Sequence, residues 1–476
     1  MTLNFYERIH RTLLENPDQE SIIWPNTDQT DSVYTNRVIL DRVATVRQVL
    51  SQQGIVSGQS VLLAVPVSFD LIGSLLAIMA LGAIPVLPPA GSSLWGVLLL
   101  MRRHGSKAVI VAKRPPAFIQ LIANWLDILI LTPTTHSGAS ITWLPPQTVD
   151  PNQPALISHS SGSTGQPKAI WRSHRVLLAQ HEALSRSFPA WPGQRDFPLF
   201  PNILLHNLAT GTVSILPDLP RFALTRIDPA RIVQQIIRQR VQTLTGNVYY
   251  FVNLLAYLQT HPHPFPQVRA VGVGGSPVPE RLAQALKATF AGAEVYIIYG
   301  SSEAEPIAIR TVGSGPENPR LGYVVGLIHP SIQVRIRPTD TLRFADETTQ
   351  PMGEIEVKGA HVATDTTDWL ATGDYGYLNP AGQLVLTGRR GNAQLHGGVG
   401  HYQIEHTLLA VAGVEQAAAR ATETGFAVYV QGSTNEADLR RLLADQFPAD
   451  LIEQIQFRDT LPVDARHHSK IRYDAL

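Results

Sequence analysis

The sequence predicts an α/β protein. We expect a large N-terminal domain of two α/β subdomains and a small β-rich unit, followed by a small α+β C-terminal domain. Apolar strand-like runs alternate with helical patterns from about residue 60 to residue 300, which is typical of parallel sheets covered by helices. Shorter strands of alternating polarity begin near residue 328, and a mixed pattern follows from about residue 391. A chain of 476 residues has room for two or three such units.

The N-terminus, MTLNFYERIHRTLLENP, places Glu7, Arg8 and Arg11 among apolar residues. This pattern indicates an amphipathic helix and not a signal peptide. The uncharged stretch 71–87, LIGSLLAIMALGAIPVL, is just short of a membrane span and is broken near its end by Pro85. We therefore expect a buried helix and a strand of a parallel sheet there, and no membrane span.

The alternation of strands and helices defines the two subdomains. In the first we expect strands at 60–65, 84–87, 108–112 and 127–131 and helices at 69–81 and 94–103. In the second we expect helices at 174–188, 229–239, 249–259 and 279–290 and strands at 268–274 and 294–300.

Shorter elements complete the chain. The β-rich unit is predicted from strands at 332–337, 354–359 and 383–388. The C-terminal domain is predicted from helices at 403–411 and 436–446, a hairpin across 416–430 that turns at Thr424 and Gly425, and a strand at 453–457.

The composition is that of a globular protein and excludes several kinds of site. The chain is 44% hydrophobic and 16% charged, and its 38 basic residues equal its 38 acidic residues. This balance gives no indication of nucleic acid or an anionic membrane as a partner. The absence of cysteine excludes disulfides, a thiolate nucleophile and cysteine-ligated metals. It is consistent with a reducing compartment, and we expect a cytoplasmic protein.

The stretch SHSSGSTGQPKAIW at 158–171 predicts a phosphate-binding loop between two strands. Its glycines allow backbone N–H groups to point into one concavity, its hydroxyls add donors, and Lys168 adds a charge. It is not a Walker A loop, because Lys168 is followed by Ala169 and the spacing differs. The alternative interpretation is a flexible Ser/Gly linker, which the flanking strands and Lys168 disfavour.

Six motifs in order resemble those of the adenylate-forming (ANL) superfamily, which includes acyl- and aryl-CoA synthetases, nonribosomal-peptide adenylation domains and luciferases. The first is the loop SSGSTGQPK, which resembles the phosphate loop of that superfamily. The others are Gly274-Gly275-Ser276-Pro277, Tyr299-Gly300-Ser301-Ser302-Glu303, GEIEVKG at 353–359, Thr372-Gly373-Asp374 with Gly388-Arg389, and LPVDARHHSKI at 461–471.

The resemblance implies a two-domain enzyme that forms an acyl-adenylate from ATP and a carboxylic acid. Residues 1–390 would be the N-terminal AMP-binding domain that binds ATP and the acid. Residues 391–476 would be a mobile C-terminal domain that carries the catalytic lysine. ATP and Mg²⁺ are the implied cofactors, with CoA or a phosphopantetheinyl carrier protein as the acceptor.

The resemblance also implies roles for individual residues. Lys470 would reach the α-phosphate and the attacking carboxylate, Ser302 would donate to the α-phosphate, and Glu303 would bind Mg²⁺. The β- and γ-phosphates would be held by Ser160, Ser161, Gly162, Ser163, Thr164, Gly165 and Lys168. The adenosine would be bound by Gly274, Gly275, Ser276, Tyr299, Gly300, Asp374 and Arg389, with Tyr299 stacked on adenine and Asp374 on the ribose hydroxyls.

The segment GRRGNAQLHGGVGHYQIE at 388–405 departs from the superfamily pattern. Gly391 occupies the hinge position, and glycine can absorb a large backbone rotation there. The usual Ile-Lys pair is absent and the following loop is unusually rich in glycine. In relatives this loop lines the pantetheine path, so the departure concerns thioester formation and not adenylation.

The acyl pocket is expected near FPLFPNILLHNLATG at 197–211 and at Val248. His206, Asn207 and Val248 are its candidate residues, and most neighbouring side chains are apolar. No acidic residue takes the place where amino-acid adenylation domains bind an amine. This favours a fatty or other apolar carboxylic acid, with an amino acid or an aryl acid as alternatives.

Three fates of the adenylate remain open. The acyl group could be transferred to CoA or to a separate acyl or peptidyl carrier protein, since the chain ends six residues after Lys470 and no fused carrier is expected. The runs PVDARHHSK and YGSSEAEP resemble the branch that contains olefin β-lactone synthetases, in which a β-hydroxyl of the acid displaces AMP. A non-catalytic nucleotide-binding relic is the third alternative.

Overall fold

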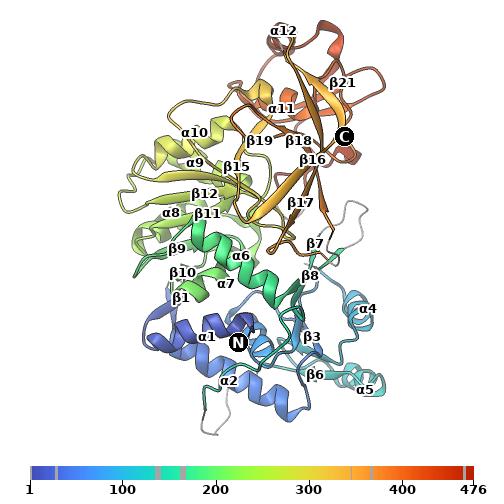
Figure 1. Ribbon diagram of the computed structural model, residues 1–476. Coiled ribbons are helices and arrows are strands. Elements are labelled where there is room, and N and C mark those ends of the chain that lie inside the picture. The colour runs from blue at the N-terminus through green and yellow to red at the C-terminus, as the bar shows by residue number, and fades with distance from the viewer. Residues whose placement is uncertain are drawn as a thin grey trace. The chain divides into compact units, whose positions relative to one another are not determined.

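The computed structural model describes residues 3–26, 30–89, 91–133, 141–160, 168–344, 346–364, 368–464 and 468–476. Its contacts divide the chain into two compact units (Figure 1). The first comprises Met1–Phe222 with Ala360–Thr367, and the second comprises Ala223–Gly359 with Asp368–Leu476. Within the described residues, no helix combines the length and apolar character needed to cross a membrane.

The first unit contains a mostly parallel six-stranded sheet. In spatial order its strands are β6 (Leu129–Leu131), β5 (Ala108–Val111), β3 (Ser60–Ala64), β4 (Ile84–Val86), β7 (Pro154–Ser160) and β8 (Lys168–Ser173). Only the pair β7 and β8 is antiparallel. Its crossover helices are α3 (Phe69–Ala80), α4 (Leu94–His104) and α5 (Ala117–Trp125). The predicted alternation of strands and helices is therefore confirmed in this part of the chain.

A second group of strands in this unit comprises β9 (Arg195–Pro198), β10 (Val213–Ile215), β1 (Glu20–Pro25) and β2 (Asp31–Thr35). The pairs β9/β10 and β10/β1 are parallel, and β1/β2 is antiparallel. The accompanying helices are α1 (Phe5–Glu15), α2 (Asn36–Gln52), α6 (His174–Ser187) and α7 (Pro201–Thr210), with the short helix η1 (Pro220–Phe222).

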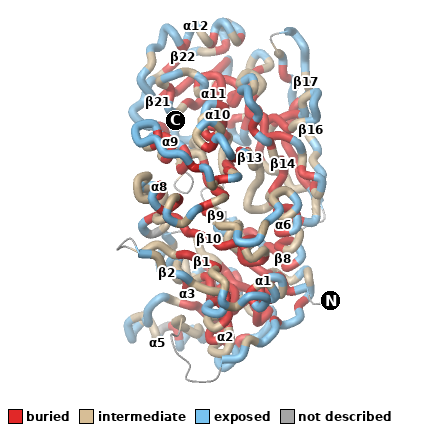
Figure 2. Tube along the Cα trace, turned by 90° about the vertical axis from the view of Figure 1, so that its left-hand side faces the viewer, coloured by how far each residue is buried: buried red, intermediate tan, exposed pale blue. Residues whose placement is uncertain are grey.

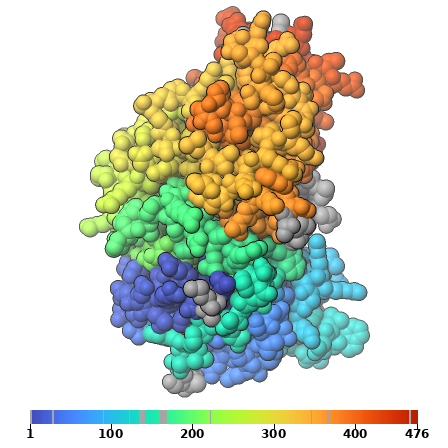
Figure 3. Space-filling view, viewed as in Figure 1, coloured from blue at the N-terminus to red at the C-terminus, as the bar shows by residue number. Residues whose placement is uncertain are grey.

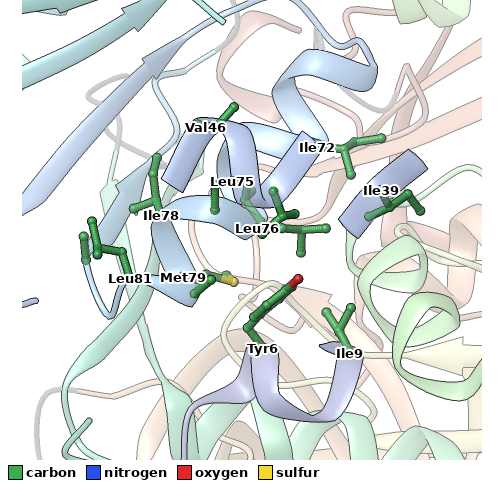
Figure 4. Close-up of a cluster of buried hydrophobic side chains, with 14 of the residues drawn as sticks. Tyr6, Ile9, Ile39, Val46, Ile72, Leu75, Leu76, Ile78, Met79 and Leu81 are labelled. Carbon is green, nitrogen blue, oxygen red and sulfur yellow. The ribbon is translucent and has the colours of Figure 1, made fainter. Parts of the chain in front are cut away.

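The main core of the first unit lies between α1, α2 and α3 (Figure 4). Tyr6 and Ile9 of α1 pack against Leu76 and Met79 of α3, and all four are almost completely buried. Asn4 caps α1 by accepting from the backbone N–H of Tyr6 and also donates to the carbonyl of Met79 over 2.8 Å. The apolar stretch predicted to be a buried helix and strand is therefore the centre of this core.

The second unit begins with three parallel strands, β11 (Thr243–Asn247), β12 (Ala270–Gly274) and β13 (Glu294–Tyr299). The sheet continues with antiparallel strands β14 (Ala308–Thr311), β15 (Tyr323–Ile328), β19 (Gln383–Arg389), β18 (Leu370–Leu378), β17 (Thr349–Gly359) and β16 (Ile332–Arg343). The helices are α8 (Pro229–Arg238), α9 (Val248–Thr260) and α10 (Glu280–Thr289), with short helices η2 (Leu224–Arg226) and η3 (Pro319–Leu321).

The C-terminal part of the second unit is α+β, as predicted. Its strands are β20 (Val414–Ala421), β21 (Phe426–Gly432) and β22 (Ile452–Phe457), where β20/β21 is an antiparallel hairpin and β21/β22 is parallel. Its helices are α11 (His401–Leu409), α12 (Glu436–Gln446), η4 (Ala449–Leu451) and η5 (Tyr473–Ala475). One apolar cluster, built from β20, β21, α11 and α12, forms its core.

Two parts of the sequence interpretation need correction. Strands β16 and β17 have 12 and 11 residues, longer than predicted, because their pairing continues across a bulge at Pro338. Helices α2 and α5 were not predicted. The buried apolar residues of α2 recur at helical spacing, so its amphipathic pattern was present in the sequence: Ile39, Leu40, Val43, Val46 and Leu50.

Candidate active site

The predicted phosphate loop connects β7 to β8, and the two strands pair as far as Ser160 and Lys168. Lys168 is exposed at the first position of β8. The other predicted phosphate-binding residues lie outside the described residues: Ser161, Gly162, Ser163, Thr164 and Gly165. The strands on both sides of the loop are confirmed, and the contacts of the loop itself stay a prediction.

A pair of histidines that the sequence did not reveal lies beside this loop. His159 donates from Nδ1 to the carbonyl of Leu87 over 2.8 Å, so its Nε2 is an acceptor. His104 on α4 approaches this nitrogen with its own Nε2 at 3.3 Å. Burial is the main reason that the pKa of His104 is lowered. The two rings therefore hold the end of β7 against α4.

The carboxyl ends of the three parallel strands of the second unit bring predicted residues together. In register, Asn247 lies opposite Gly274, and Gly274 lies opposite Ile298. Val248, the stretch from Gly274 to Ser276 and the stretch from Tyr299 to Glu303 therefore leave the sheet at one edge. This is the edge at which open α/β sheets bind ligands.

Asp374 lies at the centre of a hydrogen-bonded group at this edge. It faces Arg389 across β18 and β19, and the Arg389 guanidinium donates to its Oδ1. The hydroxyl of Tyr299 donates to its Oδ2 over 2.8 Å. Asp374 raises the pKa of Arg389, while burial, together with Asp374, raises the pKa of Tyr299 well above its usual value. Two donors thus fix the orientation of a buried carboxyl group.

The segment that carries Lys470 lies next to the predicted adenine stretch. The hydroxyl of Ser276 donates to Oγ of Ser469 over 2.9 Å. Asp464 fixes the segment from the other side, because its side chain accepts from the backbone N–H of Lys470 and its own N–H donates to the Lys470 carbonyl. The structure therefore brings together Ser276 and the neighbour of Lys470, which are 193 residues apart.

Ser302 and Glu303 lie in a tight turn directly after β13. The backbone groups of Ser301 and Ala304 exchange two hydrogen bonds, and Oγ of Ser301 accepts from the N–H of Glu303 over 3.3 Å. Glu303 is half-buried. Within the described residues, no group of three or more His, Cys, Asp or Glu side chains could hold a metal by itself.

Glu405 on α11 is a second buried carboxylate that the sequence did not reveal as a site residue. Its Oε1 accepts from the backbone N–H of Ala419 and from Nδ1 of His401, and both of its oxygens accept from the hydroxyl of Tyr473 at 2.9 and 3.0 Å. Nε2 of His401 accepts from the backbone N–H of Arg389 over 3.0 Å. Since that N–H can only donate, His401 is neutral and carries its proton on Nδ1.

A glycine makes this arrangement possible. A Cβ added at Gly388 would lie 3.3 Å from Cδ2 of His401, so the ring packs directly on the backbone before Arg389. We name the set His401, Glu405 and Tyr473 the Glu405 network. It links the backbone of Arg389 to the chain three residues beyond Lys470.

Two of the predicted pocket residues, His206 and Asn207, lie in the first unit, and Val248 lies in the second. Nδ1 of His206 lies 3.0 Å from Nδ1 of His181 on α6, and both side chains are buried. Burial lowers the pKa of His206 to about 3 and that of His181 to about 4. This histidine pair is therefore uncharged at neutral pH.

Asn207 has a clear structural task. Its Nδ2 donates to Asp196 of β9 over 2.8 Å and to Ser214 of β10 over 3.0 Å. Its side chain therefore ties α7 to two neighbouring strands, and both amide hydrogens are used inside the fold.

Comparison with known proteins agrees with this geometry. Residues 9–365 match the family described as AMP-binding enzyme. The chain belongs to the AMP-binding enzyme family. Members of this adenylate-forming superfamily use ATP to activate a carboxylic acid, and the chain is accordingly an adenylate-forming ligase.

Individual relatives extend over nearly the whole chain. The chain is 26% identical to the olefin β-lactone synthetase of Stenotrophomonas maltophilia (strain K279a), and the match covers 99% of this chain and 97% of that protein. The amide bond synthetase McbA of Marinactinospora thermotolerans has a similar fold, with a TM-score of 0.79, 19% identity and 98% coverage of both chains. ATP-bound MatB of Rhodopseudomonas palustris gives a TM-score of 0.78 with 19% identity, covering 100% of this chain and 98% of that one.

Proposed function

We propose that this AMP-binding enzyme activates an apolar, fatty-type carboxylic acid and transfers the acyl group to a thiol of CoA or of a separate carrier protein. The observation that carries the proposal is the convergence in the second unit of four groups. These are the Lys470 segment, the Ser276 hydroxyl, the Asp374–Arg389 pair and the Glu303 turn.

The chemistry explains why these residue types are needed. In adenylation a carboxylate oxygen attacks the α-phosphate, the bond to the β-phosphate breaks, and pyrophosphate leaves. Both reactants are anions, so cations and donors must hold them in line. We assign that task to Lys470 and to Ser302. The Asp374 carboxylate would accept hydrogen bonds from the ribose hydroxyls. These would replace or add to the hydrogen bonds that it accepts from Tyr299 and Arg389.

The residues present fit a magnesium ion. Mg²⁺ takes oxygen ligands and is usually held by one or two carboxylates together with substrate phosphates. Glu303 supplies one carboxylate at the strand edge, which matches that pattern. Bound there, Mg²⁺ would neutralise charge on the phosphates. The backbone N–H of Glu303 donates to Oγ of Ser301, which holds the backbone of this turn in place.

The preference for an apolar acid is supported by the histidine pair. His206 and His181 are buried and neutral, so they offer no cation for a second carboxylate on the substrate. The carboxylate that contacts α7, Asp196, is buried and accepts from Asn207. It is therefore used inside the fold and not presented to an amino group of a substrate.

Capture of the adenylate by the β-hydroxyl of the acid is the second candidate. In that reaction the hydroxyl oxygen attacks the acyl carbonyl, the bond from that carbonyl to AMP breaks, and the hydroxyl proton is released, giving a β-lactone. Two observations favour it. The match to the olefin β-lactone synthetase of Stenotrophomonas maltophilia covers 99% of this chain. In addition, the glycine-rich loop departs from the superfamily pattern where relatives bind pantetheine.

Product analysis distinguishes the two candidates. The enzyme is incubated with ATP and matched pairs of acids, such as a saturated acid and its 3-hydroxy derivative, with and without CoA. An acyl-CoA product from both acids supports the thiol route. A β-lactone from the hydroxy acid alone, unaffected by CoA, supports capture by the hydroxyl. Absence of both products with every acid contradicts the proposal.

A further inference from the structure

Two helices of the first unit expose an unusual amount of apolar surface. On α4 the exposed fractions are 81% for Trp95 and 69% for Leu99. On α5 they are 62% for Phe118, 69% for Leu121 and 84% for Trp125. Figure 2 shows the trace of α5 as largely exposed, and both helices lie at the surface in Figure 3. Large side chains exposed in a group mark interaction sites.

The topology places both helices on one face of the six-stranded sheet (Figure 1). The crossover through α3 runs from β3 to its neighbour β4, whereas those through α4 and α5 run in the opposite direction, to β5 and then β6. Right-handed crossovers in opposite directions lie on opposite faces. The packing agrees, since Leu100 and Met101 of α4 contact Leu62 and Val109, a different sheet face from the one that α3 covers.

The charges between Asp70 and Asp127, the interval that contains both helices, have one sign. From residue 71 to residue 126 the chain contains no Asp or Glu. The same interval contains five exposed basic residues at the end of α4 and in the loops that follow: Arg102, Arg103, Lys107, Lys113 and Arg114. None of these five forms an ion pair with a described carboxylate. The whole chain therefore has a net charge of zero, whereas the interval 71–126 carries an excess of five positive charges.

We propose that this α4–α5 surface docks on an anionic lipid membrane. We define it by the apolar residues Leu94, Trp95, Leu99, Phe118, Leu121 and Trp125 and the five basic residues named above. Tryptophan and leucine on exposed helix faces, bordered by lysine and arginine, are typical of helices that lie in the lipid interface. The basic residues would contact anionic headgroups while the apolar side chains enter the acyl boundary.

The charge also argues against the main alternative, a second copy of the chain. A twofold interface places the same surface on both partners. Two α4–α5 surfaces in contact would bring ten positive charges together with no carboxylate from the interval 71–126 to compensate them. Like-charge juxtaposition opposes such an interface.

Vesicle sedimentation of the full-length protein tests this inference. The two vesicle types are pure phosphatidylcholine and phosphatidylcholine with phosphatidylglycerol. We expect at least about tenfold stronger partitioning to the anionic vesicles, which decreases as salt is raised. The variants Trp95→Ser/Trp125→Ser and Arg102→Gln/Arg103→Gln should each lose about tenfold or more. Because these side chains are exposed, both variants should fold.

Matched variants elsewhere give the controls. Leu327→Ser/Val252→Ser removes exposed apolar side chains, and Arg440→Gln/Arg441→Gln removes two positive charges from α12. Both should bind vesicles like the wild type. No binding by the wild type, equal binding to neutral vesicles, or equal loss in the controls would overturn the proposal. Self-association that disappears in the tryptophan variant would also overturn it, in favour of a second copy.

Discussion

At the scale of single residues, the Glu405 network connects two groups to which we assign roles in adenylation, the Asp374–Arg389 pair and the Lys470 segment. His401 fixes the backbone of Arg389, whose side chain holds Asp374. Tyr473 fixes the chain that follows Lys470. Because His401 and Tyr473 both donate to Glu405, one buried carboxylate positions the Arg389 backbone and the chain that follows Lys470.

The variant Tyr473→Phe tests this coupling. It removes one hydroxyl that donates to a buried carboxylate, which is worth about 1.5–3 kcal/mol. We expect kcat for acid-dependent ATP–pyrophosphate exchange to fall about tenfold while the KM for ATP stays within about twofold. Tyr429→Phe is the control, since its hydroxyl makes no hydrogen bond among the described residues. An unchanged kcat in Tyr473→Phe would contradict the positioning role.

The buried histidine pair predicts how stability depends on pH. Burial lowers the pKa of His206 from 6.5 to about 3 in the folded protein. Between these values the unfolded chain binds a proton that the folded chain does not, so stability rises with pH and is lost on acidification. One such histidine contributes up to about 1.4 kcal/mol per pH unit.

Urea unfolding at pH 7, 6 and 5 measures this contribution. His206→Gln should lower the pH dependence of the unfolding free energy by about 1 kcal/mol per pH unit. His263→Gln, at an exposed position, should leave the dependence unchanged. Equal dependence in His206→Gln and in the wild type would show that His206 is not held neutral.

At the scale of elements, the sequence predicted strands and helices well where apolar periodicity is strong. The prediction for α12 agrees in both bounds, and that for β3 agrees to within one residue. The contacts between elements could not be predicted. Glu405 and Tyr473 are 68 residues apart, and nothing local to either indicates that they meet. The motif residues could be named from the sequence because six motifs follow one another in the order that the adenylate-forming superfamily has, and their individual roles stay predictions.

The docking of α10 against α11 offers a test at this scale. Arg310 donates to Glu280 over 2.5 Å with both side chains about 5% exposed, and the N–H of Glu280 donates to Nε2 of His406 over 3.0 Å. Arg310→Met leaves the Glu280 carboxylate buried without its cation. We expect a loss of about 3–5 kcal/mol in unfolding free energy.

The double variant Arg310→Met/Glu280→Leu controls for the lost charge pair. It removes both charges and should recover most of the stability, because an apolar pair avoids the cost of desolvation. Chemical denaturation of the three proteins provides the comparison. A double variant less stable than Arg310→Met would contradict this explanation.

At the scale of the whole molecule, transfer to a thiol would require residues 391–476 to swing about Gly391. Gly391 has φ of +90° and nothing within 4 Å of an added Cβ, so the backbone is free to turn there. The swing would break contacts made by α11, such as the hydrogen bond from Gln403 to the carbonyl of Arg320 and that from His406 to the carbonyl of Gly322. Capture by a β-hydroxyl needs no such swing.

Gly391→Pro therefore distinguishes the steps. Proline fixes φ near −65° and restricts rotation at this position. If a thiol is the acceptor, thioester formation should slow about tenfold more than adenylation, measured as product release against pyrophosphate exchange. Gly193→Pro is the control, since Gly193 is also exposed, has a positive φ and donates no backbone hydrogen bond among the described residues. Equal loss of both steps in Gly391→Pro alone would contradict a hinge at this residue.

The central claim is that Lys470 serves adenylate formation. The direct measurement is acid-dependent ATP–pyrophosphate exchange by the wild type and Lys470→Ala, with ATP binding measured by calorimetry on the same samples. We predict that the variant loses exchange by about 100-fold or more while its affinity for ATP changes by less than about threefold. Full exchange by Lys470→Ala, or no exchange by the wild type with any acid although it binds ATP, would contradict the account.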